Sequence, residues 1–111
     1  MTRYMFIYHN PPMADEAMMD PDAMNAAMEQ WNQWGAKVGP GLVDFGTPLG
    51  GGIHVAPDGT TEPSTRQVTG YTIVEADSID TVLGWAKEHP HLLMPGGCEI
   101  EVHELLPVPG M

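Results

Sequence analysis

The sequence predicts an α+β fold in which two helices pack on one face of a four-stranded antiparallel sheet. Four segments carry the β-branched and aromatic residues, or the polar–apolar alternation, that are typical of strands. Two other segments repeat apolar residues at three- and four-residue steps, as helices do. The resulting order, β-α-β-β-α-β, is the split βαβ arrangement called ferredoxin-like. A chain of 111 residues, 42% of them hydrophobic, predicts a single domain over residues 1–111.

The first strand is expected at residues 3–9, where the sequence reads RYMFIYH. Both alternating sets of side chains are mostly apolar: Tyr4, Phe6 and Tyr8 on one side, and Met5, Ile7 and His9 on the other. This pattern favours a strand that is covered on both faces, although a buried helix would show the same pattern. The sequence NPP at 10–12 ends the segment.

The first helix is expected to begin at Pro21, with Asp20 as its N-cap. Its apolar stripe ends at the helix-breaking sequence GPG at 39–41. The predicted stripe consists of Met24, Ala27, Met28, Trp31, Trp34 and Val38.

The middle of the chain predicts shorter elements. LVDFG at 42–46 reads as a short strand, IHVA at 53–56 as a second extended piece, and PDG at 57–59 as a turn. The polar stretch at 60–65 is expected to be a loop. Residues 68–76, VTGYTIVEA, predict a strand because β-branched and aromatic residues dominate it.

A second helix is expected at 79–89, capped by Ser78 and closed by Pro90. Its apolar stripe consists of Ile79, Val82, Leu83 and Ala86. Residues 98–106 then alternate as a strand with one core-facing side and one side that is exposed or faces a cavity. The core-facing set is Cys98, Ile100 and Val102, and the exposed set is Glu99, Glu101 and His103.

Two helices can cover only one face of this sheet, yet the strands at 3–9 and 68–76 carry apolar residues on both faces. A monomer would therefore expose a large apolar patch. We expect a homodimer in which two sheets meet face to face through these strands.

Composition excludes several classes of function. The formal net charge of −11, from 15 acidic and 4 basic residues, opposes binding to nucleic acid, because that binding depends on Lys and Arg. No apolar run reaches the roughly 20 residues of a membrane span, and the start of the chain does not resemble a signal peptide. The single cysteine fits a reducing compartment, so we expect a cytoplasmic protein without membrane contact.

The glycine-rich stretches match neither a phosphate-binding loop nor a dinucleotide fingerprint, and no serine lies in a nucleophile elbow. No cofactor is expected. His54, in a glycine-flanked segment, and His103, on the exposed side of a strand, are interpreted as structural or solvated residues.

His89 and His91 follow the second helix and leave three hypotheses open. A histidine at the end of a helix can stabilise the free carbonyls and the negative end of the dipole, which is the favoured interpretation for His89. The pair could instead do acid–base chemistry. A zinc site would need further ligands, such as Cys98 and His9, and is not expected.

The chain resembles the YCII-related (DGPF) family over nearly its whole length. The resemblance rests on RYMFIYHN, on the tryptophan-bearing helix with LVDFGTPLG, on VTGYTIVEADSIDTVLGWAKEHPHLL and on GGCEIEVHEL. It implies a dimeric α+β barrel of ferredoxin-like topology with a cleft between sheet and helices in each subunit. Some relatives are thought to use a His–Asp pair in that cleft.

The chain departs from the family pattern at two places. DGTTEPSTRQVTG stands where the family has Asp-Gly-Pro-Phe, and the first helix has no histidine. The family's His–Asp pair therefore cannot be carried over. A substitute for this His–Asp pair would use His9 as the general base, with Asp44 orienting its ring. The ligand would then be held by Trp31, Trp34, Tyr71, His89 and His91.

Two functions follow from these residues. One is binding of a small, aromatic molecule in the cleft, with lyase or isomerase chemistry. The other is a non-catalytic dimeric module of a regulatory system, which the resemblance also implies. The favoured interpretation of the tryptophans is nevertheless plain core packing, and that of His9 is a strand-end histidine bonded to backbone.

Overall fold

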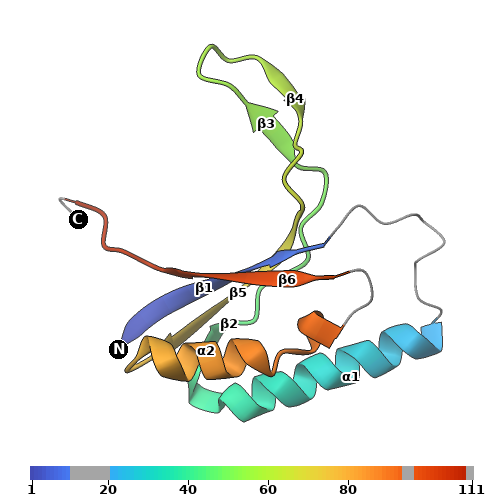
Figure 1. The fold of residues 1–111 in the computed structure, drawn as a ribbon, viewed down its shortest axis with the longest axis vertical. Helices are drawn as coiled ribbons and strands as arrows, with labels where there is room; N and C mark the ends of the chain where they lie inside the picture. Colours follow the sequence, from blue (N-terminus) through green and yellow to red (C-terminus); the bar gives the residue numbers. More distant parts are fainter. Residues whose placement is uncertain (11–20, 94–96, 110–111) are drawn as a thin grey trace.

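The computed structural model of the chain describes residues 1–10, 21–93 and 97–109. It contains a four-stranded antiparallel sheet of order β2-β5-β1-β6, two helices and a separate two-stranded sheet (Figure 1). The main-sheet strands are β1 (Thr2–His9), β2 (Leu42–Asp44), β5 (Val68–Ala76) and β6 (Glu99–Glu104). The helices α1 (Pro21–Val38) and α2 (Ile79–Lys87) lie on the same side of this sheet (Figure 1). The predicted α+β class is confirmed, and the arrangement is consistent with the ferredoxin-like class.

Strand alternation separates a core face from an open face, as the sequence predicts. On the core face, Tyr4, Phe6 and Tyr8 of β1 are buried. Their partners on β5 are Val74, Thr72 and Gly70, and these are buried too. The open face carries Met5 opposite Ile73 and Ile7 opposite Tyr71, all four of them half-buried.

Helix α1 adds two tryptophans to the aromatic residues that β1 places in the core. Trp34 and Val38 are buried, and Trp31 is half-buried. Met28, also in the predicted stripe, is 57% exposed. The indole Nε1 of Trp34 donates to the carbonyl oxygen of Trp85 at 2.9 Å, which ties α1 to α2. The predicted N-cap Asp20 and the side chain of Met24 lie outside the described part.

Helix α2 begins as predicted. Ser78 Oγ accepts a hydrogen bond from the backbone N–H of Thr81 at 3.3 Å, which satisfies one of the free donors of the first turn. Val82 and Ala86 are buried, whereas Ile79 and Leu83 of the predicted stripe are exposed. The helix ends at Lys87, two residues earlier than predicted, and a 3₁₀ turn, η3 (Pro90–Leu93), follows.

The segment between β2 and β5 differs from the prediction. β3 (Ile53–Val55) pairs with β4 (Thr61–Pro63), which lies in the stretch predicted as a loop. We call this hairpin the arm; it projects from the side of the sheet opposite the helices (Figure 1). Its second strand was missed because Thr-Glu-Pro lacks the apolar alternation of a strand. β2 and β6 are also shorter than predicted.

Neither helix in the described part of the chain combines the length and the apolarity that crossing a bilayer requires.

Candidate functional site

An apolar cavity of about 410 Å³ lies between α1, the end of β1, the loop after β2, and η3. Its aromatic lining comes from Tyr8, Trp31 and Phe45, and Tyr71 of β5 borders it. Asn10, Asn32 and His91 contribute polar side chains. None of the described residues that line it is Asp, Glu, Lys or Arg. A concave, largely apolar site with a few polar groups is the usual form of a small-molecule site.

The loop after β2 forms one wall because of Gly46. This residue has φ +81°, a backbone conformation that L side chains rarely adopt. A Cβ at this position would lie 1.7 Å from the carbonyl oxygen of Tyr71. Asp44 Oδ1 accepts from the Gly46 N–H at 2.8 Å and fixes the turn. Phe45 is thereby placed against Trp31, with the two rings stacked at a centroid distance of 6.3 Å.

A buried hydrogen-bonded chain lies behind the cavity. The hydroxyl of Tyr8 is 2.6 Å from Thr72 Oγ1 and 2.8 Å from His89 Nε2. Thr72 Oγ1 donates to the carbonyl oxygen of Phe45 at 2.9 Å. His89 Nδ1 accepts from the backbone N–H of His91 at 2.9 Å.

These contacts determine the direction of each hydrogen bond. Because Nδ1 of His89 accepts, its ring hydrogen is on Nε2, which therefore donates to the Tyr8 hydroxyl. Tyr8 then donates to Thr72, whose own hydrogen goes to Phe45. Every member of the chain is satisfied with His89 neutral, and such a network holds the side chains around it in one arrangement.

Burial keeps these groups uncharged. It lowers the pKa of His89 to about 3, and the nearby His91 contributes in the same direction. Burial also raises the pKa of Tyr8 well above its ordinary value, with Thr72 acting in the opposite sense. The pKa of His91 is lowered by burial, although hydrogen bonds to the backbone of His9 and Glu99 raise it. At neutral pH the described part of the cavity wall is therefore electrically neutral.

Of the five ligand-binding residues predicted from sequence, Trp31, Tyr71 and His91 line the cavity. Trp34 belongs to the core and does not line it. His89 is 1% exposed and lies one layer behind the wall. It contacts the Trp31 ring edge-on at a centroid distance of 4.4 Å, so it supports the wall rather than touching a ligand.

The structure does not bring His9 and Asp44 together. His9 Nε2 lies 3.2 Å from Glu101 Oε1 on β6, and Asp44 bonds to its own loop. In the sheet register, Asp44 pairs with Ile73 of β5. Ile73 in turn pairs with Met5, in the middle of β1, and not with the end of β1 where His9 lies. The predicted catalytic base and the carboxylate predicted to orient it therefore lie at different places, and neither residue lines the cavity.

The helix-end hypothesis for His89 is corrected. Its side chain bonds to Tyr8 and is neutral, so it does not act as a cation on the carbonyls of α2. Only its backbone N–H caps the helix, donating to the carbonyl oxygen of Ala86 at 3.1 Å. In the described part of the chain, no group of three or more His, Cys, Asp and Glu side chains is placed to hold a metal ion.

Sequence reasoning missed Asn10, Asn32 and Phe45. Phe45 was counted as part of a strand that actually ends at Asp44. Asn32 directly follows Trp31 on α1. Because Trp31 was predicted to bind the ligand, the residue next to it could have been considered as well. Asn10 was interpreted only as the end of the first strand; its Oδ1 accepts from Thr69 Oγ1 at 2.8 Å, a contact between residues far apart in the chain.

No family model matches the chain, and no curated protein matches it.

Proposed function

We propose that the protein binds a small, uncharged, aromatic molecule in the cavity beside α1. The observation that carries this proposal is the lining: an aromatic wall, a few uncharged polar side chains such as Asn10 and Asn32, and no Asp, Glu, Lys or Arg among the described residues. Aromatic rings on the wall favour a flat ligand through stacked or edge-on contacts.

The absence of charge on the described lining decides between classes of ligand. A charged ligand would lose its hydration without an opposite charge to replace it, and that desolvation is costly. The amides of Asn10 and Asn32 can each hydrogen-bond to a neutral carbonyl or hydroxyl group. Because Asn10 Oδ1 is taken by Thr69, its Nδ2 is the atom available as a donor.

Binding is favoured over acid–base catalysis. The titratable groups on the described wall are Tyr8, Tyr71 and His91. Nε2 of His91 lies 3.2 Å from the carbonyl oxygen of His9, and the backbone of Glu99 also bonds to this side chain. Ring nitrogens held by backbone are not directed at a ligand. The proposal therefore keeps the small-molecule binding of the first function raised from sequence and leaves out its lyase or isomerase chemistry.

The test compares three aromatic probes of equal size and different charge: benzamide, benzoate and benzylamine. We expect benzamide to bind at least about fivefold more tightly than either ion, because the lining offers hydrogen bonds but no counter-charge. Amide chemical shifts in NMR titrations measure the affinities and locate the site. Equal affinity for all three probes, or shifts away from the cavity, would refute the proposal.

A pair of variants on α1 tests the role of the polar lining. Asn32→Leu removes one amide from the cavity and is expected to weaken benzamide binding about fivefold, the effect of one hydrogen bond. The matched control is Gln33→Leu, the next residue, which is also exposed but does not line the cavity. Equal losses in both variants would count against the assignment.

We also propose membership of the YCII-related family and assembly as a homodimer. The strand order β2-β5-β1-β6 supports the ferredoxin-like topology that the family resemblance implies. The open face of the sheet supports the dimer, because Met5, Ile7, Tyr71 and Ile73 form an apolar patch on the side without helices.

Sedimentation equilibrium at micromolar concentration tests the dimer. We expect a mass near twice the 12.0 kDa of the chain. Ile73→Asp places a charge in the centre of the apolar patch and is expected to give a folded monomer. Ile79→Asp is the matched control, since Ile79 is 42% exposed on α2, on the other side of the sheet. A wild-type monomer at this concentration would overturn the dimer.

A further inference from the structure

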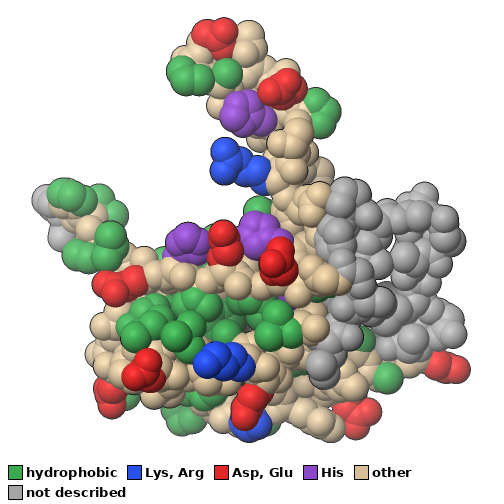
Figure 2. All heavy atoms as spheres, in the orientation of Figure 1, with side chains coloured by type: hydrophobic (Ala, Val, Ile, Leu, Met, Phe, Trp, Pro, Cys, Tyr) green, Lys and Arg blue, Asp and Glu red, His purple; other side chains and the backbone are tan. Residues whose placement is uncertain are grey.

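The arm formed by β3 and β4 has no function in the site described above. Its two strands pair with each other through residues 53–55 and 61–63, and Ser64 N–H donates to the Gly52 carbonyl at its base at 3.0 Å. Figures 1 and 2 show the arm standing away from the body, and Figure 2 shows open space beside it. A two-stranded hairpin is only marginally stable alone in water, so a surface that covers it would stabilise it.

One side of the arm is suited to such a surface. Ile53 and Val55 lie on one side by strand alternation and are 68% and 63% exposed. Pro63 and Thr61 lie directly opposite them on the same side. His54 and Glu62 pair on the other side, which is polar. A ribbon with one apolar side and one polar side is typical of a strand pair packed against another layer.

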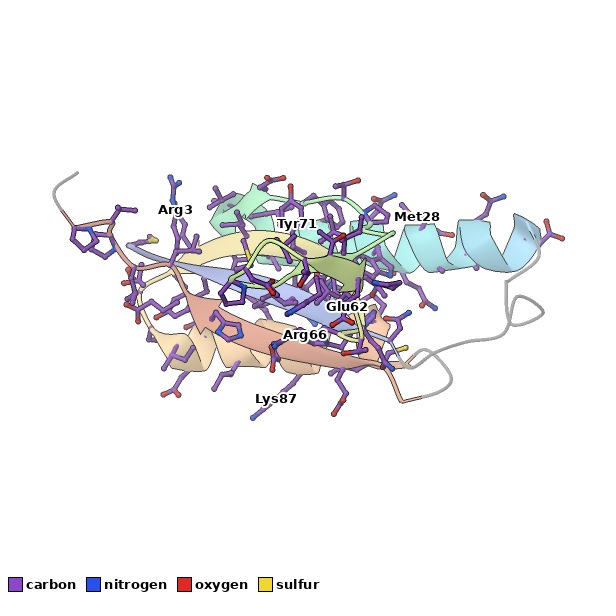
Figure 3. The ribbon with its side chains drawn as sticks, turned by 90° about the horizontal axis from the view of Figure 1, so that it is seen from above. Arg3, Met28, Glu62, Arg66, Tyr71 and Lys87 are labelled. Carbon is purple, nitrogen blue, oxygen red and sulfur yellow. The ribbon has the colours of Figure 1, made fainter. Side chains whose placement is uncertain are left out.

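The open face of the main sheet has the complementary character and lies on the side from which the arm projects. Figure 3 looks down on this side, where Glu62 and Arg66 mark the arm and Tyr71 marks the sheet. The arm of the same chain stands off this face rather than lying on it (Figure 2). A second copy of the chain can bring its face to the arm, and twofold symmetry then repeats the contact.

The area of the open face favours this arrangement. A stable interface buries about 800 Å² on each partner. The patch of Met5, Ile7, Tyr71 and Ile73 is half-buried, so its four side chains expose only a small part of such an area. Contact between the patches alone is therefore too small for a stable dimer. The exposed apolar side of the arm adds to the area of the interface and requires no change in the main sheet or the helices.

We propose that the arm is a dimerisation element, which packs Ile53 and Val55 on the open sheet face of a second copy. The inference rests on the proposed homodimer and specifies which segment completes its interface. Because each chain carries a net charge of −11, the contact depends on apolar burial and not on attraction between the two chains.

The test uses neighbouring residues on the two sides of the arm. Ile53→Asp and Val55→Asp, made separately, place a charge on the apolar side, and His54→Asp places the same side chain on the polar side. All three positions are exposed, so the fold should persist, and thermal unfolding of each variant checks this. We expect the dimer dissociation constant from sedimentation equilibrium to rise at least tenfold for the first two variants and to stay within twofold for His54→Asp.

The outcomes separate this inference from the dimer itself. A dimeric wild type whose three arm variants dimerise equally well overturns the role of the arm and leaves the dimer standing. An equal loss in His54→Asp and Val55→Asp overturns the side-specific packing. A monomeric wild type overturns the dimer, and the role of the arm with it.

Discussion

The free energy of unfolding is expected to fall by about 2 kcal/mol between pH 7.5 and pH 5, because His89 must stay neutral in the folded protein. Its pKa is about 3 in the folded state and about 6.5 in an unfolded chain. The unfolded state therefore binds the extra proton first, and stability is lost as the pH falls through 6.5 and down to about 3. His91, whose pKa is also lowered, acts in the same direction. Chemical denaturation at a series of pH values measures the slope.

The control for this prediction removes one histidine at a time. His89→Gln should unfold more easily at pH 7.5, because a buried network loses its imidazole, and its stability should then depend much less on pH down to 5. His54→Gln removes an exposed histidine and should keep the wild-type slope. The range above pH 5 avoids protonation of the carboxylates. A wild-type slope in His89→Gln would show that the imidazole is not the group responsible.

Gly46→Ala is expected to lower the free energy of unfolding by about 3 kcal/mol or more, because two penalties act at one position. The residue has φ +81°, and an added Cβ would lie 1.7 Å from the carbonyl oxygen of Tyr71. The loop must then move away from β5, which also opens the cavity wall carried by Phe45. Denaturant unfolding measures the loss, and the benzamide titration should show weakened binding.

Gly97→Ala is the matched control, because Gly97 has the same φ of +81° but no atom of the described residues within 4 Å of its added Cβ. It should show only the penalty of the left-handed backbone, about 1 kcal/mol. The difference between the two variants isolates the overlap with β5. Equal stabilities would mean that the loop yields freely and that Gly46 does not hold the wall.

Local patterns were sufficient to predict most of the fold. The alternation in β1 correctly separated Tyr4, Phe6 and Tyr8 from Met5 and Ile7. The start of α2 was predicted because a capping serine bonds to an amide three residues away, within the same short segment. The arm was only half predicted, since β4 is a strand through its pairing with β3 and not through its own residues.

The candidate site was predicted less well. Trp31, Tyr71 and His91 could be selected by residue type, and they line the cavity. His9 and Asp44 were predicted to act together only because His9 ends one strand and Asp44 lies in another. The register of the sheet places the two residues apart.

The sequence by itself determined the order of the two helices and the four main-sheet strands, the faces of these strands and the start of α2, because each depends on periodicity or on bonds between close neighbours. Only the tertiary structure decided the role of His89. Its pKa and its partner depend on burial against Tyr8, which is 81 residues away in the chain. The placement of Phe45 likewise depends on the close approach of Gly46 to Tyr71 across two strands. Contacts of this kind leave no local pattern, because burial and pairing partners are set by the packing of the whole chain.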